Sequence, residues 1–185
     1  MQSEIGKEIT ATQNLDSVLR KIYEYTHQIM ETDIFSIGIF KKEEGIVDIA
    51  FSIEFGKQLP SYQRSIEDKD QLIIWCITNN QHILIKDAAT QIPNYIDEAQ
   101  WNNTMQSHHI GSFSKMQSHL YVPLTLRTEA VGAIAVHSEN KHVFDENKLD
   151  VLTALATYAA IAIDNANKMQ KLNWANQTLK TAQKA

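Results

Sequence analysis

The chain has 185 residues, 43% of them hydrophobic and 21% charged, with a single cysteine. This length suits one globular domain with a helical extension, and one cysteine excludes an internal disulfide and a cysteine-rich metal site. The net charge of -5, with scattered basic residues, argues against nucleic-acid binding. We see no signal peptide, and the apolar centre of the last predicted helix is short and rich in threonine and alanine. We therefore expect a cytoplasmic chain without membrane contact.

Two helices are predicted at the start of the chain. Residues 3–12 are polar, with Ile5 and Ile9 at helical spacing, and they form a helical lead-in. Asn14 can cap a second helix, and Asp16 in its first turn suits the helix dipole. The second helix carries an apolar stripe made of Leu15, Val18, Leu19, Ile22, Ile29 and Met30.

The middle of the chain alternates between strand and helix patterns. Residues 35–40 and 47–53 alternate in polarity around a charged turn and predict a β-hairpin. Residues 55–65 are expected to be a loop, followed by a helix that ends near Asn79 and a short strand that ends at Asp87. Residues 90–115 show no sustained period and are expected to be irregular.

The last third of the chain has the clearest pattern. Residues 118–127 and 131–136 are rich in β-branched residues and predict a second hairpin, whose second strand is apolar on both faces and therefore central. Asp145 is the expected N-cap of a long helix, with Phe144 and Leu149 at hydrophobic-staple spacing. We expect Ile22 and Ile134 to be buried with the stripe of this helix, which comprises Leu149, Leu152, Ala156, Ala159, Ile163 and Ala166.

These motifs together resemble a GAF domain. The resemblance rests on VPL at residues 122–124, EAVGAIAVHS at residues 129–138 and the helix FDENKLDVLTALATYAAIAIDNA at residues 144–166. Residues 11–33 match the way in which such domains open. The resemblance implies an α+β, GAF/PAS-like fold. In this fold a central antiparallel sheet has helices on both faces, with the first and last helices on one face and a lidded pocket on the other.

The resemblance divides the chain into a helical lead-in (residues 1–13), a GAF domain (residues 14–167) and a helical connector (residues 168–185). The connector keeps an approximately heptad apolar stripe through Leu172 and Leu179. Such a helix is either a dimer seam or a connector to a further domain, and a solvated, frayed tail is the alternative.

A candidate ligand site follows from where GAF pockets lie. Small residues on the first strand leave room, aromatic rings can stack on a planar ligand, and Asp87 can accept a hydrogen bond from a ring N–H. The ligand-binding candidates are Ser36, Gly38, Trp75, Asp87, Tyr95, Trp101, Tyr121 and His137.

Other chemistries of the family fit the residues less well. Cys76 lies on an apolar helix as a buried thiol, and it is followed by Ile77 and not by the His of a bilin attachment site, so covalent bilin is not expected. GAF-type methionine sulfoxide reductases need more than one thiol. His108, His109 and His119 are interpreted as solvated loop residues and not as metal or haem ligands.

A partial likeness to the NKFDE signature of cyclic-nucleotide-binding GAF domains occurs at residues 140–146. Here Phe144 and Asp145 are contiguous, whereas the family motif places a spacer between them, and the staple, cap and first-turn acid account for the same residues.

We therefore expect a sensory module that is not an enzyme, binds no metal and has an unidentified ligand or cofactor. It would form a homodimer and signal through its terminal helices to an output domain outside this chain, in two-component or cyclic-nucleotide signalling. The alternative is a ligand-free dimerisation scaffold, and catalysis within the fold ranks third.

Overall fold

The computed structural model describes residues 2–11, 14–107 and 112–184. Its strands form one antiparallel sheet in the order β3-β2-β1-β7-β6-β5, and β4 pairs with β2 beside this path. The strands are β1 (Ile34–Lys41), β2 (Ile46–Glu54), β3 (Lys57–Gln58), β4 (Tyr62–Ser65), β5 (Ile83–Ile85), β6 (Ser118–Leu126) and β7 (Glu129–Ser138).

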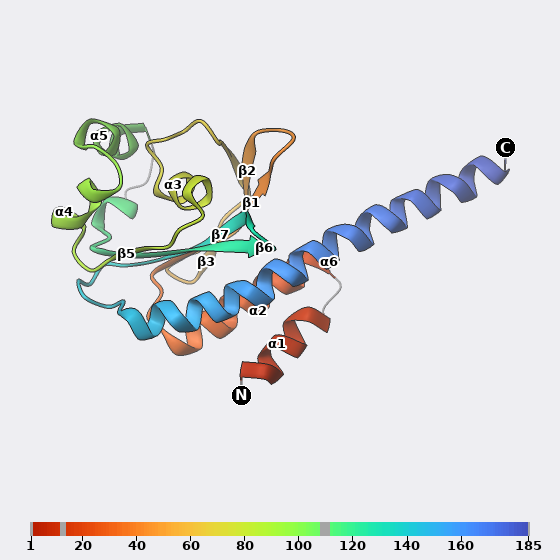
Figure 1. Cartoon of the computed structure of the whole chain (residues 1–185), viewed down its shortest axis with the longest axis horizontal. Helices are drawn as coiled ribbons and strands as arrows, with labels where there is room; N and C mark the ends of the chain where they lie inside the picture. The colour runs from red at the N-terminus through yellow and green to blue at the C-terminus, as the bar shows by residue number, and fades with distance from the viewer. Residues whose placement is uncertain (1, 12–13, 108–111, 185) are drawn as a thin grey trace.

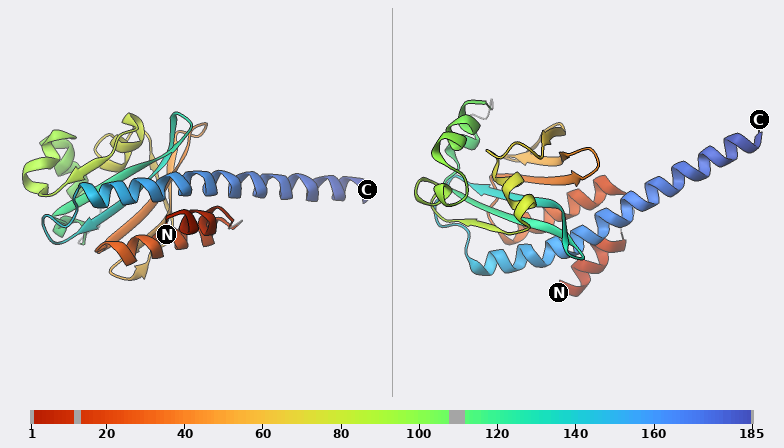
Figure 2. Two further views of the ribbon diagram at one scale, coloured as in Figure 1. Left: turned by 60° about the horizontal axis from the view of Figure 1, so that its bottom comes forward. Right: turned by 45° about the horizontal axis from the view of Figure 1, so that its top comes forward.

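Helices cover both faces of this sheet, as Figures 1 and 2 show. One face carries α1 (Gln2–Ala11), α2 (Leu15–Ile29) and the long α6 (Glu146–Lys184). The other carries α3 (Leu72–Asn79), α4 (Ala88–Gln91), α5 (Glu98–Ser107) and the 3₁₀ turns η1 (Ile92–Asn94) and η2 (Phe113–Lys115). The predicted α+β class, with the first and last helices on one face, is confirmed.

Strand β7 is central, as its sequence predicts, because both of its faces are covered. It pairs with β1 on one side and β6 on the other, and Ile134 and Val136 point into the core beneath α2 and α6. Ala133 and Ala135 belong to the second core, beneath α3. A Cβ on Gly132 would lie 2.2 Å from the carbonyl oxygen of Gly38, so the close approach of β7 to β1 requires a glycine there.

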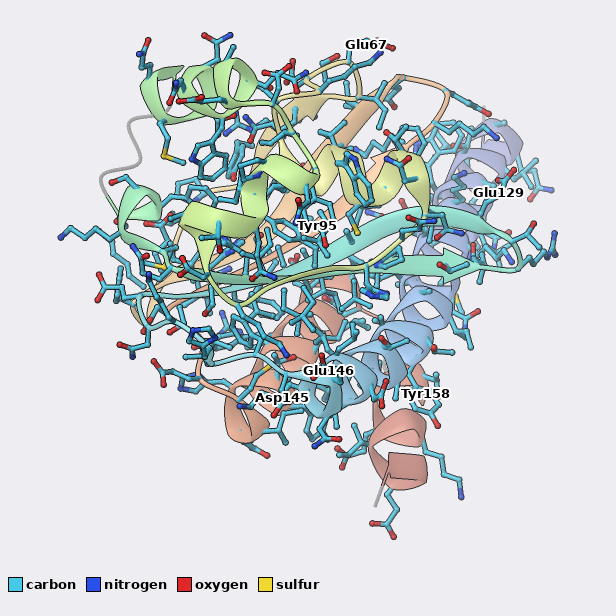
Figure 3. The ribbon with its side chains drawn as sticks, turned by 60° about the vertical axis from the view of Figure 1, so that its left-hand side comes forward. Glu67, Tyr95, Glu129, Asp145, Glu146 and Tyr158 are labelled. Atoms are coloured by element: carbon cyan, nitrogen blue, oxygen red, sulfur yellow. The ribbon has the colours of Figure 1, made fainter. Side chains whose placement is uncertain are left out.

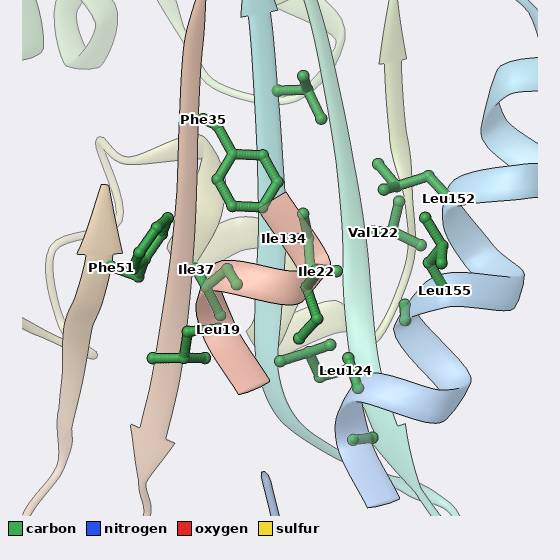
Figure 4. Packing of buried hydrophobic residues seen from close by; sticks show 14 of the residues in the cluster. Leu19, Ile22, Phe35, Ile37, Phe51, Val122, Leu124, Ile134, Leu152 and Leu155 are labelled. Atoms are coloured by element: carbon green, nitrogen blue, oxygen red, sulfur yellow. The ribbon is translucent and has the colours of Figure 1, made fainter. Parts of the chain in front are cut away.

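The helical layer buries the stripes predicted from the sequence. Leu152, Ile163, Ile22 and Ile134 are all buried, and Figure 4 shows three of them gathered around the strands. The helix caps were also predicted correctly. The Asn14 side chain accepts from the N–H of Ser17 at 3.2 Å, and the Asp145 carboxylate accepts from the N–H of Lys148 at 2.9 Å.

The lead-in helix α1 packs against the outer side of α6. Ile9 is fully buried in the main core. A Cβ on Gly6 would lie 2.5 Å from the ring of Tyr158, so the helix meets this ring at its glycine (Figure 3). The lead-in is therefore part of the packed domain.

Three expectations were wrong. The loop predicted over residues 55–65 contains β3 and β4, which are exposed edge strands and so lack apolar alternation. The irregular region predicted over residues 90–115 contains α5, which turns few apolar side chains toward the sheet and so has a weak helical period. Ile29 does not complete the buried stripe of α2: it lies in the last turn and is 46% exposed.

Helix α6 continues beyond the sheet as an exposed rod (Figure 1). Among the described residues it is the one helix long and apolar enough, by length and composition, to cross a membrane. Its apolar stretch is thus longer than the sequence analysis judged. Half of that stretch is buried inside the domain, where it packs against the sheet.

Substituting Leu152→Ala should lower the free energy of unfolding by about 2–5 kcal/mol, because the change removes buried methyl groups and leaves a cavity. Denaturant titration measures this. The matched control is Leu179→Ala on the exposed end of the same helix, with an expected change within about 0.5 kcal/mol at protein concentrations too low for association. Equal losses in the two variants would contradict the packing described.

Candidate ligand-binding site

The floor of the site consists of two neighbouring rows of side chains that run across the sheet. The inner row contains directly paired positions on β2, β1, β7 and β6: Ser52, Ser36, Ala135 and Tyr121. The outer row lies one pleat further along: Glu54, Ile34, His137 and His119. Paired positions share one face of a sheet. Because three inner-row side chains are small, the floor is hollow at this row.

The roof and walls come from segments on the same side of the sheet. The start of α3, the middle of α5 and η2 cover the hollow, and β4 adds Tyr62 and Arg64. Gln71 donates a hydrogen bond to the Thr104 hydroxyl at 3.3 Å, which joins the start of α3 to α5. The enclosed volume is about 80 Å³. The arrangement is a small, partly open pocket with polar groups on its floor and aromatic rings in its roof.

Ser52 is the most informative polar group of the floor. The residue is only 4% exposed, and among the described residues its Oγ has no hydrogen-bond partner. A buried hydroxyl without a partner costs roughly 1–3 kcal/mol. The pocket therefore contains a polar group that a bound molecule or water can satisfy.

His119 and His137 form a buried cross-strand pair. Their Nδ1 atoms lie 2.8 Å apart, so one Nδ1 carries the shared proton and donates while the other accepts. The two rings are therefore complementary tautomers. His137 lines the pocket, whereas His119 lies behind it, and within the described residues the His119 Nε2 atom has no partner.

Burial keeps both imidazoles neutral. It lowers the pKa of His119 to about 3, although the backbone of Met116 acts in the opposite direction. Burial, together with the charge that His119 would carry, holds the pKa of His137 well below its usual value. Burial also raises the pKa of the Tyr121 hydroxyl. This side of the pocket offers hydrogen bonds and aromatic surface without charge.

Half of the candidates named from the sequence meet in this pocket. Its lining includes Ser36, Trp101, Tyr121 and His137. Trp101 and Phe113 contact each other in the roof, with ring centres 6.0 Å apart, and Phe113 meets the His137 ring edge-on at 5.1 Å.

The other four candidates lie outside the lining. Gly38 is packed beneath Val47 and Ile73 and leaves no space. Trp75 and Tyr95 contact each other, with ring centres 5.0 Å apart, in the adjoining second core. Asp87 caps α4 by accepting from the N–H of Ala89 at 3.2 Å, and it pairs with Lys141 at 2.8 Å.

Sequence reasoning missed several polar and aromatic lining residues because they lie at the end of β2, on β4, at the start of α3, on α5 and on η2, where tertiary packing decides which side chain faces inward. Among the missed residues are Ser52, Glu54, Tyr62, Arg64, Gln71, Thr104 and Phe113. The expectation that His119 is a solvated loop residue was wrong: it is fully buried in β6. Extending the predicted hairpin by one pair places it opposite His137 and would have revealed this. His108 and His109 lie outside the described residues.

Other suggestive groups have structural roles. Burial raises the pKa of the Cys76 thiol far above its usual value, which keeps it protonated. Phe144 is fully buried, and Glu146 pairs with Lys86 at 3.0 Å beside the Asp145 cap (Figure 3). In the part of the chain that the structure describes, no group of three or more His, Cys, Asp or Glu side chains is arranged to hold a metal ion.

Comparison with known proteins identifies the family of this architecture. The sequence model described as "GAF domain" matches residues 12–164. A search of curated protein sequences found no significant match.

Several solved structures are similar. The GAF domain of a phosphoenolpyruvate-protein phosphotransferase from Coxiella burnetii is 18% identical, with a TM-score of 0.68, over 92% of this chain and 94% of that one. Residues 122 to 287 of a methyl-accepting chemotaxis protein are 18% identical, with a TM-score of 0.66, over 89% and 98%. The free methionine-R-sulfoxide reductase from Neisseria meningitidis, in complex with its substrate, is 12% identical, with a TM-score of 0.67, over 91% and 89%. At these identities the likeness shows the fold.

The buried histidine pair should make stability depend on pH. Both folded-state pKa values lie below the unfolded value of about 6.5, so below that pH the unfolded chain binds more protons than the folded chain. Stability should therefore fall as the pH drops below about 6.5, by up to about 1.4 kcal/mol per pH unit for each histidine. Urea titrations between pH 7.5 and pH 4.5 measure this dependence.

In the double variant His119→Gln, His137→Gln the dependence should be much weaker. The control is His82→Gln, at an exposed position, which should keep the pH dependence of the wild-type chain. An unchanged pH dependence in the double variant would mean that the pair is not the cause.

Proposed function

Because the chain belongs to the GAF domain family, a common sensory and regulatory module of signalling proteins, we propose that it binds a small molecule and passes the signal along α6 to an output domain. The binding site is the pocket above the inner row, and the ligand acts by completing its hydrogen bonds. The module works in the cytoplasm as a homodimer.

The observation that carries this proposal is the buried, unpartnered hydroxyl of Ser52 in the pocket floor. Unsatisfied buried groups are rare in folded proteins because each costs stability. The unpartnered hydroxyl of Ser52 lies in a hollow between small side chains, beneath a roof of aromatic rings. A ligand that hydrogen-bonds to Ser52 supplies a partner that the described side chains do not.

Strands β6 and β7 connect the pocket to α6. Tyr121 and His137 face the pocket, while the adjacent residues Leu120 and Val136 belong to the core that α6 covers. A displacement of either strand by a ligand is transmitted through these closely packed side chains, because a packed core resists continuous deformation. The helix then carries the shift beyond the domain.

An exposed apolar face on α6 supports dimerisation. Ile161, Met169, Leu172 and Leu179 are exposed and follow one another at steps of eight, three and seven residues, which keeps them on one side of the helix. Apolar stripes of this kind pair with a second helix. A second copy of this chain, aligned in parallel, is the occupant we propose.

A binding role fits the residues better than catalysis does. Free methionine-R-sulfoxide reductases share the fold, so the architecture itself supports enzymes as well as sensors. The single thiol of this chain is buried and held protonated, which suits packing and not redox chemistry.

A ligand-free scaffold is the second candidate. It is favoured by the size of the pocket, since about 80 Å³ is small beside the roughly 300–1,000 Å³ of typical ligand sites. Dimerisation alone is compatible with both candidates, whereas binding in the pocket distinguishes them.

Binding should appear as an increase in melting temperature in a screen of amino acids, cyclic nucleotides and tetrapyrroles, because a ligand at 100 times its Kd adds about 2.7 kcal/mol of stability. In Ser36→Leu, which fills the hollow, the shift should disappear. Ser61→Leu, at an exposed loop position, should keep it. No shift with any compound in the wild-type chain would favour the scaffold.

Sedimentation should show a dimer for the intact chain at micromolar concentration. A version ending at Asn167, which lacks Leu172 and Leu179, should associate more weakly, as should the double variant Leu172→Glu, Leu179→Glu. Trp174→Gln, which changes a residue that is 70% exposed and lies off this face, is the control. If all four are monomers at high micromolar concentration, the proposed dimer does not form.

A further inference from the structure

The size of the pocket restricts its ligand. A buried water needs roughly 10–15 Å³ on the scale by which this pocket measures about 80 Å³, so the space holds about five to eight water-sized groups. A short aliphatic molecule with a few polar atoms fits this space. A cyclic nucleotide or a tetrapyrrole does not fit unless the roof moves.

Arg64 supplies a cation that no other group among the described residues neutralises. It lines the pocket from β4, and its Cζ lies 5.1 Å from the centre of the Tyr62 ring. Within the described residues its side chain forms no ion pair and no hydrogen bond. Stacking on an aromatic ring leaves the N–H donors at the edge of the guanidinium plane available, and their fork geometry matches a carboxylate.

Glu54 supplies the opposite charge at the other end. It lines the pocket from the end of β2, and in the described part of the chain its carboxylate also has no ion pair or hydrogen bond. Arg64 pairs with Val47, and Val47 and Glu54 are seven positions apart on β2, which corresponds to roughly 20 Å of strand. Both side chains line the same pocket, and among the described residues no ion pair or hydrogen bond joins them.

Between the charges the lining combines apolar and aromatic side chains with the hydroxyl groups of the floor. Ser52 lies between Ile49 and Glu54 along the lining of β2, and Trp101 and Phe113 close the roof above. The middle of a ligand therefore meets aliphatic and aromatic surface and the hydroxyl of Ser52. Ligand charges on neighbouring atoms would not reach both ends.

We infer that the pocket binds a small ω-amino acid, a zwitterion with its charges at the two ends of a short aliphatic chain. The carboxylate pairs with Arg64, and the ammonium group pairs with Glu54. Binding neutralises both unpaired protein charges at once, which separates this class from monocarboxylates, amines and nucleotides. This inference rests on the small-molecule function proposed above and specifies its ligand.

Calorimetry with the intact chain tests the inference through a series of glycine, β-alanine, γ-aminobutyrate, δ-aminovalerate and ε-aminohexanoate. Affinity should rise from glycine to a maximum within the longer members. Methyl esters and N-acetyl derivatives of the best member should bind at least ten-fold more weakly. Affinity that is equal along the series, or that is unchanged when either charge is removed, would overturn the inference.

Protein variants locate each charge. Arg64→Gln and Glu54→Gln should each lower the affinity for the best-binding zwitterion at least ten-fold. The control variants Arg127→Gln and Glu43→Gln, at exposed turn positions, should leave this affinity unchanged. The loss of affinity caused by Glu54→Gln should be absent for the unbranched monocarboxylate of the same length, because that ligand has no ammonium group. An equal loss for both ligands would contradict the pairing. Unchanged melting temperatures in the absence of ligand show that the variants are folded.

The outcomes separate the inference from the function on which it rests. If a cyclic nucleotide or a compound of another class binds, and Ser36→Leu abolishes that binding, the sensory function stands. The assignment of the ligand as an ω-amino acid is then overturned. If no compound in either screen binds, both proposals fall and the scaffold remains.

Discussion

Burial of both faces of β7 is the constraint on which the rest of this structure depends. A strand covered on both sides must lie at the centre of its sheet, with a helical layer above and another below. In this chain the two layers receive different side chains. Ile134 and Val136 fill the core beneath α2 and α6, while Ala133 and Ala135 face α3. The same strand therefore builds a dense core on one side and leaves space on the other.

The pocket exists because small side chains occupy the inner row of the floor, whereas the outer row beside it carries larger ones. Ser36, Ser52 and Ala135 leave a hollow that the paired histidines and the roof aromatics border without filling. Neutral histidines suit this position, since each finds a partner in the other and neither brings an uncompensated charge into the core. The charged groups stay at the rim, where water reaches them in the absence of a ligand.

The two halves of helix α6 have different surroundings. Its first half is the longest element of the hydrophobic core, and its second half, without the sheet, is exposed on every side. Because a helix is stiff, a change in how the first half sits on the sheet moves the distant end as a lever. Packing of α1 against Tyr158 and α2 against the sheet holds this first half in place, so the domain controls where the exposed half points.

The sequence by itself determined the elements whose formation depends on local pattern. Alternation in residues 35–40 and 118–127, the Asp145 cap and the leucine and alanine stripe of the last helix specify strands, a boundary and a buried face through neighbours in the chain. Tertiary structure alone decided the membership of the site. Glu54 and Arg64 carry no periodic signal, and the alternation that includes Ser52 does not show that its side chain borders a hollow. Arg64 reaches the pocket because β4 pairs with β2. Asp87 and Trp75 have suitable chemistry, yet a helix cap and a neighbouring ring engage them elsewhere. Local patterns record which face of an element is apolar, whereas a pocket depends on which distant side chains are small enough to leave space.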